Sequence, residues 1–156
     1  MEKRKEVVRL ISELITGLDT KQKQQILAQL LQTKEGIPIS AFNSSLSGLE
    51  IVVRYAKDND RRSFSEIAAT LNRKLSTIYT TYTKSRKKFS QALDVSDNSV
   101  CIPITIFHDR RYAVLELIIS FLKEQERLSF KEIAALLHKH YNTITTTYRR
   151  YKSKHG

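Results

Sequence analysis

Two segments of the chain repeat apolar residues at the spacing i, i+3, i+4 and i+7, which places them on one face of an α-helix. The segments span residues 46–59 and 113–125. In the first, the apolar residues are Leu49, Val52, Val53 and Ala56; in the second, they are Leu115, Ile118, Ile119 and Leu122. We therefore predict a scaffold helix over each segment, with this face buried.

Residues 2–35 carry a different helical pattern. The stretch EKRKEVVRLISELITGL has one apolar stripe, formed by Val7, Leu10, Ile11, Leu14, Ile15 and Leu18, and Gly17 suits a helix C-cap. The stretch TKQKQQILAQLLQTK has a second stripe, formed by Ile26, Leu27, Leu30 and Leu31. We predict a helical hairpin that either docks on the first of the two units that follow or pairs with the same element of another copy. We favour a homodimer through residues 2–35, because the segments that follow are expected to have their own cores.

The remainder of the chain contains an internal repeat. Residues 63–82 read SFSEIAATLNRKLSTIYTTY and residues 129–148 read SFKEIAALLHKHYNTITTTY, and aligning Leu49 with Leu115 carries the match through both phrases without a gap. Upstream, Ile37-Pro38-Ile39 matches Ile102-Pro103-Ile104, where proline favours a short extended entry followed by a turn. The predicted organisation is an N-terminal hairpin (1–35), a first unit (36–93), a linker (94–101) and a second unit (102–156).

Each repeated phrase predicts two further helices. The pairs Ser63 with Glu66 and Ser129 with Glu132 have the spacing of a capping box, which marks the start of the second helix in each unit. The third helix is expected to begin at Ser76 or Asn142, which are good N-cap types. Between these helices stand Asn72 and His138, at a turn position that needs a positive φ and that both residue types tolerate.

The apolar spacing across each phrase is that of a helix-turn-helix. The pattern is carried by Ile67, Ala68, Leu71 and Ile78, and again by Ile133, Ala134, Leu137 and Ile144. The alanine fits the point where two helices approach closest. We predict an all-α fold, with two tandem tri-helical helix-turn-helix units preceded by the N-terminal hairpin.

Charge is concentrated in the second half of each phrase. The 156-residue chain has a formal net charge of +11 and a pI near 9.8. Residues 67–93 and 133–156 contain several Lys and Arg residues but neither Asp nor Glu. Positive charge at matched positions of both units indicates a polyanionic partner.

With these motifs in view, each unit resembles the DNA-binding domains of sigma-factor region four and of quorum-sensing response regulators. The shared pattern E-I-A-x-x-L followed by T-I begins at Glu66 in the first unit and at Glu132 in the second. The resemblance implies DNA-facing side chains at Ser76, Thr77, Tyr79, Thr80 and Lys84, and at Asn142, Thr143, Thr145, Thr146 and Arg150. It covers about 40 residues of each half and none of residues 1–35.

The basic ends of the third helices suit phosphate contacts. These residues are Lys84, Arg86, Lys87 and Lys88 in the first unit, and Arg149, Arg150, Lys152 and Lys154 in the second. The first turns of both helices lack arginine, which favours A·T-leaning or indirect readout. Tyr82 and Tyr148 occupy one equivalent position, where we expect a buried ring with a hydrogen-bonded hydroxyl.

The expected function is sequence-preferring binding of double-stranded DNA by a transcriptional regulator, such as a repressor, or by an architectural or partition factor. A tandem makes the second binding step intramolecular, and the differing third helices predict similar but non-identical half-sites. The alternative is a protein-interaction module that contacts RNA polymerase or another regulator. A cytoplasmic, nucleoid-associated location fits the N-terminus, which lacks the pattern of a secretory signal.

Other functions find little support in the sequence. Catalytic metal needs clustered carboxylates, but Glu66 and Glu132 are expected to cap helices. The other candidates lie at the ends of the scaffold helices, and they are Asp58, Asp60, Glu124 and Glu126. The four histidines all fall in the second half without counterparts in the first, so we expect neither an enzyme nor a metal site. The single cysteine, Cys101, is expected to be a small buried side chain. No cofactor is expected, and the apolar runs are too short for a membrane span.

Overall fold

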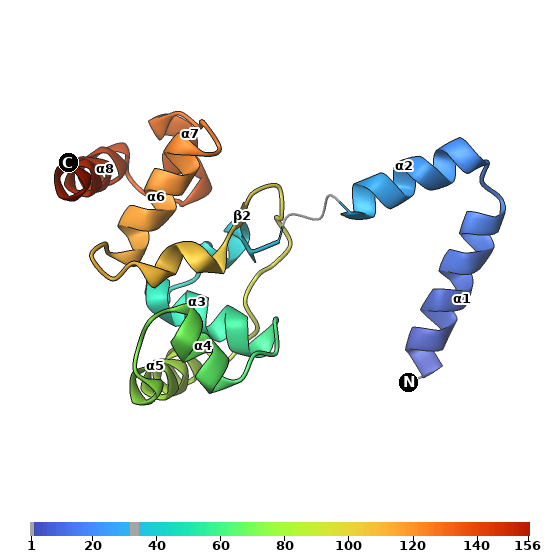
Figure 1. Ribbon diagram of the computed structural model, residues 1–156, viewed down its shortest axis with the longest axis horizontal. Coiled ribbons are helices and arrows are strands. Elements are labelled where there is room, and N and C mark those ends of the chain that lie inside the picture. The colour runs from blue at the N-terminus through green and yellow to red at the C-terminus, as the bar shows by residue number, and fades with distance from the viewer. Residues whose placement is uncertain (1, 32–34) are drawn as a thin grey trace. The chain divides into compact units, whose positions relative to one another are not determined.

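The computed structural model describes residues 2–31 and 35–156, except for the side chains of residues 27–31. The chain divides into two compact units, Met1–Lys34 and Glu35–Gly156. Both are built mainly from α-helices (Figure 1), which confirms the predicted all-α character. Among the described residues, none of the helices combines the length and the apolarity that crossing a membrane requires.

The N-terminal unit contains the two predicted helices, α1 (Glu2–Thr16) and α2 (Thr20–Leu31). Asp19 caps α2 through a capping box that was not predicted. Its Oδ1 accepts from the Gln22 amide at 2.8 Å, and Gln22 Oε1 accepts from the Asp19 amide at 3.1 Å. Gly17 follows the last residue of α1. The apolar side chains of α1 are all exposed, and the predicted stripe residues Leu27, Leu30 and Leu31 have side chains outside the described part.

The larger unit contains the two repeats, each with the same succession of elements. The first repeat has β1 (Ile37–Pro38), a 3-10 helix η1 (Ile39–Asn43), α3 (Gly48–Asp58), α4 (Phe64–Thr70) and α5 (Leu75–Lys88). The second has β2 (Cys101–Ile102), η2 (Ile104–His108), α6 (Val114–Glu124), α7 (Phe130–Leu136) and α8 (Tyr141–His155). The predicted extended entry at each Ile-Pro-Ile segment, followed by a turn, is present in both repeats.

The N-terminal caps of α4 and α7 agree with the prediction. Ser63 and Glu66 form the predicted capping box of α4, and Ser129 and Glu132 form the same box on α7. The scaffold helices α3 and α6 are slightly shorter than the predicted 46–59 and 113–125. Ser47 caps α3 through a further box with Glu50, so the helix begins only after that serine.

The predicted starts of the third helices are wrong by one residue. Helix α5 begins at Leu75 and α8 at Tyr141, after Lys74 and His140, neither of which makes a side-chain cap. The turn decides this boundary. Asn72 and His138 adopt the predicted positive φ, at 51° and 50°, and the chain then reaches an extended residue that leads directly into the helix. Arg61 and Arg127 occupy equivalent positions in the two repeats, and both also have positive φ, before α4 and α7 respectively.

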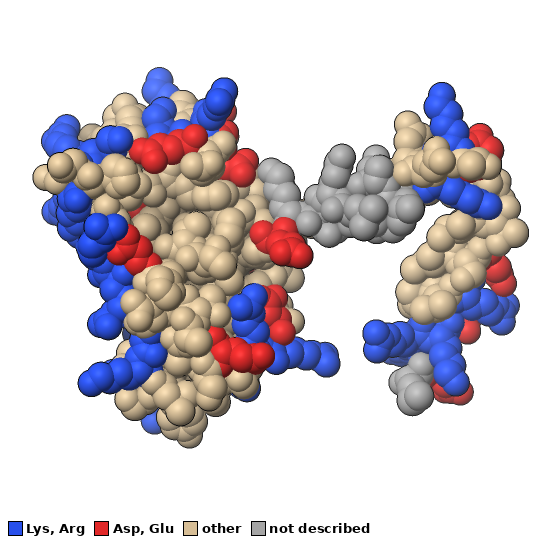
Figure 2. All heavy atoms as spheres, viewed as in Figure 1, with Lys and Arg blue, Asp and Glu red and all other residues tan. Residues whose placement is uncertain are grey.

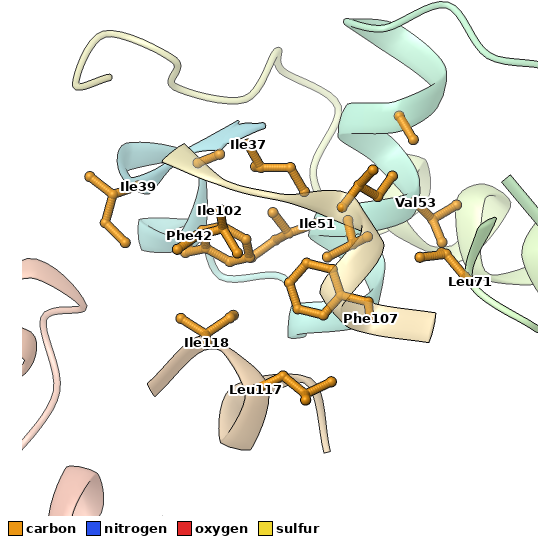
Figure 3. Packing of buried hydrophobic residues seen from close by; sticks show 14 of the residues in the cluster. Ile37, Ile39, Phe42, Ile51, Val53, Leu71, Ile102, Phe107, Leu117 and Ile118 are labelled. Atoms are coloured by element: carbon orange, nitrogen blue, oxygen red, sulfur yellow. The ribbon is translucent and has the colours of Figure 1, made fainter. Parts of the chain in front are cut away.

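The two repeats share one hydrophobic core. Strands β1 and β2 pair antiparallel, with Ile37 opposite Ile102 and Pro38 opposite Cys101. Around them lie buried side chains from β1, η1 and α3 together with side chains from β2, η2 and α6 (Figure 3). The predicted separate core for each repeat is therefore wrong, because the buried side chains of these short elements form one cluster across both repeats.

The segment predicted as a linker, 94–101, is attached to this core. The Ser40 hydroxyl donates to the Asp94 carbonyl at 2.9 Å, and the Ile39 amide donates to the Val100 carbonyl at 2.9 Å. Leu93 and Val100 are buried at either end of the segment. The repeats are therefore joined by a packed connection, and Cys101, its last residue, is buried as expected.

Candidate nucleic-acid interface

The third helices, α5 and α8, are held on their scaffold helices by the same contacts. The Tyr82 hydroxyl donates to Asp58 Oδ1 at 2.7 Å, and the Tyr148 hydroxyl donates to Glu124 Oε1 at 2.9 Å. Burial, together with these hydrogen bonds, raises the pKa of both tyrosines. The two rings are only half-buried, so the expected burial holds in part, whereas the expected hydroxyl partner is present in both repeats.

A second matched contact joins the far end of each helix to a buried carboxylate. Lys88 Nζ lies 2.7 Å from Glu50 Oε1, and Lys154 Nζ lies 2.8 Å from Glu116 Oε2. Burial by itself would raise the pKa of each glutamate, but the hydrogen bonds from the lysine and from the start of the scaffold helix lower it below the ordinary 4.5. These carboxylates are thus kept ionised by the third helix.

The predicted basic residues therefore fall into two groups. Arg86 lies 3.6 Å from Asp58, and Lys152 lies 3.5 Å from Glu124. Together with Lys88 and Lys154, these residues are ion-paired with the scaffold. The other group makes no salt bridge within the described part of the chain, and its members are Lys84, Lys87, Arg149 and Arg150. These four side chains are exposed and keep their charge available to a partner.

The exposed side of α5 carries most of the residues predicted to face DNA. Ser76, Thr77, Thr80 and Lys84 are exposed and, with Thr81, line one shallow hollow along the helix. Tyr79 is 59% exposed, but its ring packs against the ring of Phe64 in a T-shaped arrangement, with centroids 5.5 Å apart. The helix thus presents hydroxyl groups followed by an amine.

Helix α8 presents a similar face. Asn142, Thr143 and Thr146 are exposed, as are Arg149 and Arg150 further along. Thr145 is half-buried, and its hydroxyl donates to the Asn142 carbonyl at 3.2 Å. Of the predicted residues on α8, Thr145 is therefore the one whose hydrogen-bonding capacity is already partly used within the helix.

Positive charge gathers on the side of Glu35–Gly156 that includes α5 and α8. In Figure 1, both helices lie at the left of this unit, and in Figure 2, Lys and Arg side chains predominate along that left edge. Nearby carboxylates offset the charge of the ion-paired lysines and arginines, whereas Lys84, Lys87, Arg149 and Arg150 add positive charge to this side without such a partner among the described residues.

The turn before α5 forms a further cationic site that was not predicted from the sequence. A shallow hollow there is lined by Ala68, Ala69, Asn72, Arg73, Lys74 and Arg110. The Nε of Arg73 is buried and has no hydrogen-bond partner among the described residues. Burial, with repulsion from Arg110, lowers the pKa of Arg73. An anion would satisfy both guanidinium groups.

Arg110 reaches this hollow from the other repeat. Nearby, a ring nitrogen of His108 lies 3.1 Å from the Thr70 carbonyl, which ties the end of η2 to the end of α4. The equivalent turn before α8 is lined by Ala134, Ala135, His138, Lys139 and His140. The aligned basic residues at Arg73 and Lys139 were a usable sequence signal, whereas the approach of Arg110 depends on tertiary packing.

Within the described residues, His, Cys, Asp and Glu side chains form no group of three that could hold a metal ion. Comparisons with protein-family models, with curated proteins and with solved structures found no match to this chain.

Proposed function

We propose that the chain binds double-stranded DNA through the exposed faces of α5 and α8, each acting as the recognition helix of a helix-turn-helix unit. The supporting observation is that both repeats hold this helix on its scaffold by equivalent contacts and leave its polar and basic outer face exposed. The role that follows is a transcriptional regulator, such as a repressor, or an architectural or partition factor.

The exposed faces of α5 and α8 contain two kinds of side chain, one suited to contacting bases and the other to contacting phosphates. Thr77, Thr80 and their equivalents Thr143 and Thr146 offer hydroxyl donors and methyl groups, which suit base edges and the thymine methyl. Lys84, Lys87, Arg149 and Arg150 lie further along the helices and suit phosphates, which fix position without reading sequence. In the turn before α5, Arg73 and Arg110 supply another phosphate site.

Salt dependence tests this proposal directly. Affinity for a random-sequence duplex, measured by fluorescence anisotropy, should fall steeply between 50 and 200 mM salt, because phosphate contacts release counterions. Combining Lys84→Ala with Arg150→Ala should reduce the magnitude of the log–log slope by about 2. Lys5→Ala with Lys21→Ala removes the same charge from the N-terminal unit and serves as the control. Absent or salt-independent binding would favour the alternative, a module that contacts RNA polymerase or another regulator.

Sequence preference should depend on the threonines instead. Thr80→Val with Thr146→Val keeps the shape of both faces and removes two exposed hydroxyls, so discrimination between preferred and random duplexes should fall by about tenfold. The Lys84→Ala and Arg150→Ala pair should weaken binding to both duplexes equally. Competition titrations with the two duplexes separate these effects. Unchanged discrimination in the valine variant would remove these threonines from the proposed reading surface.

A further inference from the structure

Equivalent residues of the two repeats face each other across the strand pair. Ile37 and Ile102 occupy the same position in the aligned Ile-Pro-Ile segments, and they are directly opposite in the antiparallel pairing of β1 with β2. Antiparallel strands that pair at equivalent residues are related by a local two-fold axis, which passes between those residues. The pairing of Pro38 with Cys101 is the register that such an axis requires.

The scaffold helices meet in the same manner. Gly48 is the first residue of α3, and Val114, its equivalent, is the first residue of α6. A Cβ atom placed on Gly48 would lie 2.7 Å from Val114 Cγ1 and 3.1 Å from Val114 Cβ. Glycine therefore permits a close approach of two equivalent positions. This contact is independent of the strand pair and indicates the same two-fold relation.

The third helices follow their scaffold helices. Because Tyr82 and Lys88 fix α5 on α3 as Tyr148 and Lys154 fix α8 on α6, the axis that relates α3 to α6 also relates α5 to α8. Figure 1 shows α5 and α8 on the same side of the unit and at opposite ends of it. The core shared by the repeats (Figure 3) holds this arrangement in place.

We infer that one chain reads two DNA half-sites in opposite orientations and at one fixed spacing. This inference rests on the proposed function. A two-fold axis in the protein can coincide with the local two-fold axis of B-DNA, which places the two recognition helices on half-sites in opposite orientations. Half-sites repeated in the same direction would instead need recognition helices related by a translation and a rotation along the duplex. Thr77 and Thr80 recur as Thr143 and Thr146, but Ser76 and Tyr79 are replaced by Asn142 and Thr145. The preferred site is consequently an imperfect palindrome.

Selection from a randomised duplex pool with the full chain, followed by sequencing, tests the inference. The expected product is a pair of similar half-sites in opposite orientations with a single spacing. Enrichment of half-sites in the same direction, of variable spacing or of an isolated half-site would overturn this inference and leave DNA binding intact. Failure to bind or enrich any duplex, even at low salt, would overturn the proposed function together with the inference.

The selected duplex then provides a sharper comparison. Reversing one half-site, or inserting half a helical turn between the two, should weaken binding at least about tenfold, because the second contact is lost. Altering bases outside both half-sites is the control and should leave affinity unchanged. Equal affinity for the original and the reversed duplex would contradict the two-fold arrangement.

A pair of variants links this result to the helix crossing. Gly48→Val should force α3 and α6 apart, so the selected pool should contain several spacings. Exchanging the two residues, as Gly48→Val with Val114→Gly, should restore the single spacing because the positions are equivalent. If Gly48→Val does not fold, the exchange variant alone tests whether the contact between α3 and α6 fixes the spacing. A spread of spacings in the pool selected by the exchange variant would refute that role.

Discussion

At the residue scale, the repeats preserve contacts even where their residue types differ. Asp58 pairs with Arg86 in the first repeat, and Glu124 pairs with Lys152 in the second. Each of these carboxylates also accepts a hydrogen bond from a tyrosine hydroxyl, Asp58 from Tyr82 and Glu124 from Tyr148. The sequence predicted the capping boxes because their partners are three residues apart, but it did not reveal these pairs, whose members lie on separate helices.

The ion pairs made by the buried carboxylates of Glu50 and Glu116 predict a loss of stability in acid. Glu50 and Glu116 have folded-state pKa values below 4.5, so their contribution is complete well above pH 4.5 and is lost as the pH falls through the folded-state values. Glu50→Gln with Glu116→Gln should lower the free energy of unfolding by about 1 kcal/mol for each pair at pH 7, since both lysines are partly exposed.

Urea unfolding at pH 7 and near pH 3 measures this effect. The difference between the variant and the unmodified protein should narrow at the lower pH, because the unfolded chain takes up protons on these glutamates more readily than the folded protein does. Glu13→Gln removes the exposed pair with Arg9 in α1 and serves as the control. A constant difference at both pH values would show that these carboxylates do not link protonation to folding.

Arg54 shows a difference between the repeats at the same scale. It is fully buried in α3 and donates to Asp58 and to the Ser85, Phe89 and Gln91 carbonyls. These bonds hold the end of α5 and the start of the following connection. The equivalent residue in α6 is Ser120, whose hydroxyl donates to its own helix at Leu117. A buried arginine was unexpected, because three of its four acceptors are backbone carbonyls that no sequence pattern identifies.

At the element scale, helix existence followed from apolar spacing, while the starts of α5 and α8 depended on turn geometry. The residues before both helices have extended backbones set by the preceding turn, and this geometry outweighed the N-cap preferences of Ser76 and Asn142. The exposed stripe of α1 is another element-scale feature. Leu14 is 73% exposed, and Val7, Leu10 and Ile11 are each about half exposed.

We expect a second copy of the chain to cover this stripe, as the spacing of residues 7, 10, 11 and 14 suits helix pairing. Leu14→Glu should convert a dimer into a monomer, because a charge in an apolar helix interface is costly. Light scattering coupled to size-exclusion chromatography measures the mass. Ser12→Glu, on the opposite face of α1, should leave the dimer intact. A monomeric unmodified protein at every concentration would refute the expectation.

At the scale of the whole molecule, the shared core makes the two repeats one folding unit. Ile102 in β2 is fully buried beside residues of the first repeat. Ile102→Ala should therefore reduce the free energy of unfolding by about 2–5 kcal/mol and weaken both repeats together. Hydrogen exchange should show faster exchange in the amides of α5 as well as those of α8.

Leu75→Ala is the matched control for this change, because Leu75 is 51% exposed and its replacement should alter stability by no more than about 0.5 kcal/mol. Faster exchange in α8 alone, with α5 unchanged in the Ile102→Ala variant, would show that the repeats unfold independently.

The sequence alone determined the number and approximate bounds of the helices, the duplication, the caps of α4 and α7 and the positive φ of Asn72 and His138. These features depend on residues close together in the chain, so their periodicity and local hydrogen bonding can be recognised in the amino-acid sequence. Tertiary structure decided which lysines and arginines are ion-paired, how Arg110 comes beside Arg73, and how Ile37 and Gly48 meet their equivalents. Those outcomes depend on contacts between residues that are distant in sequence. These residues come together because the two repeats bury one shared core.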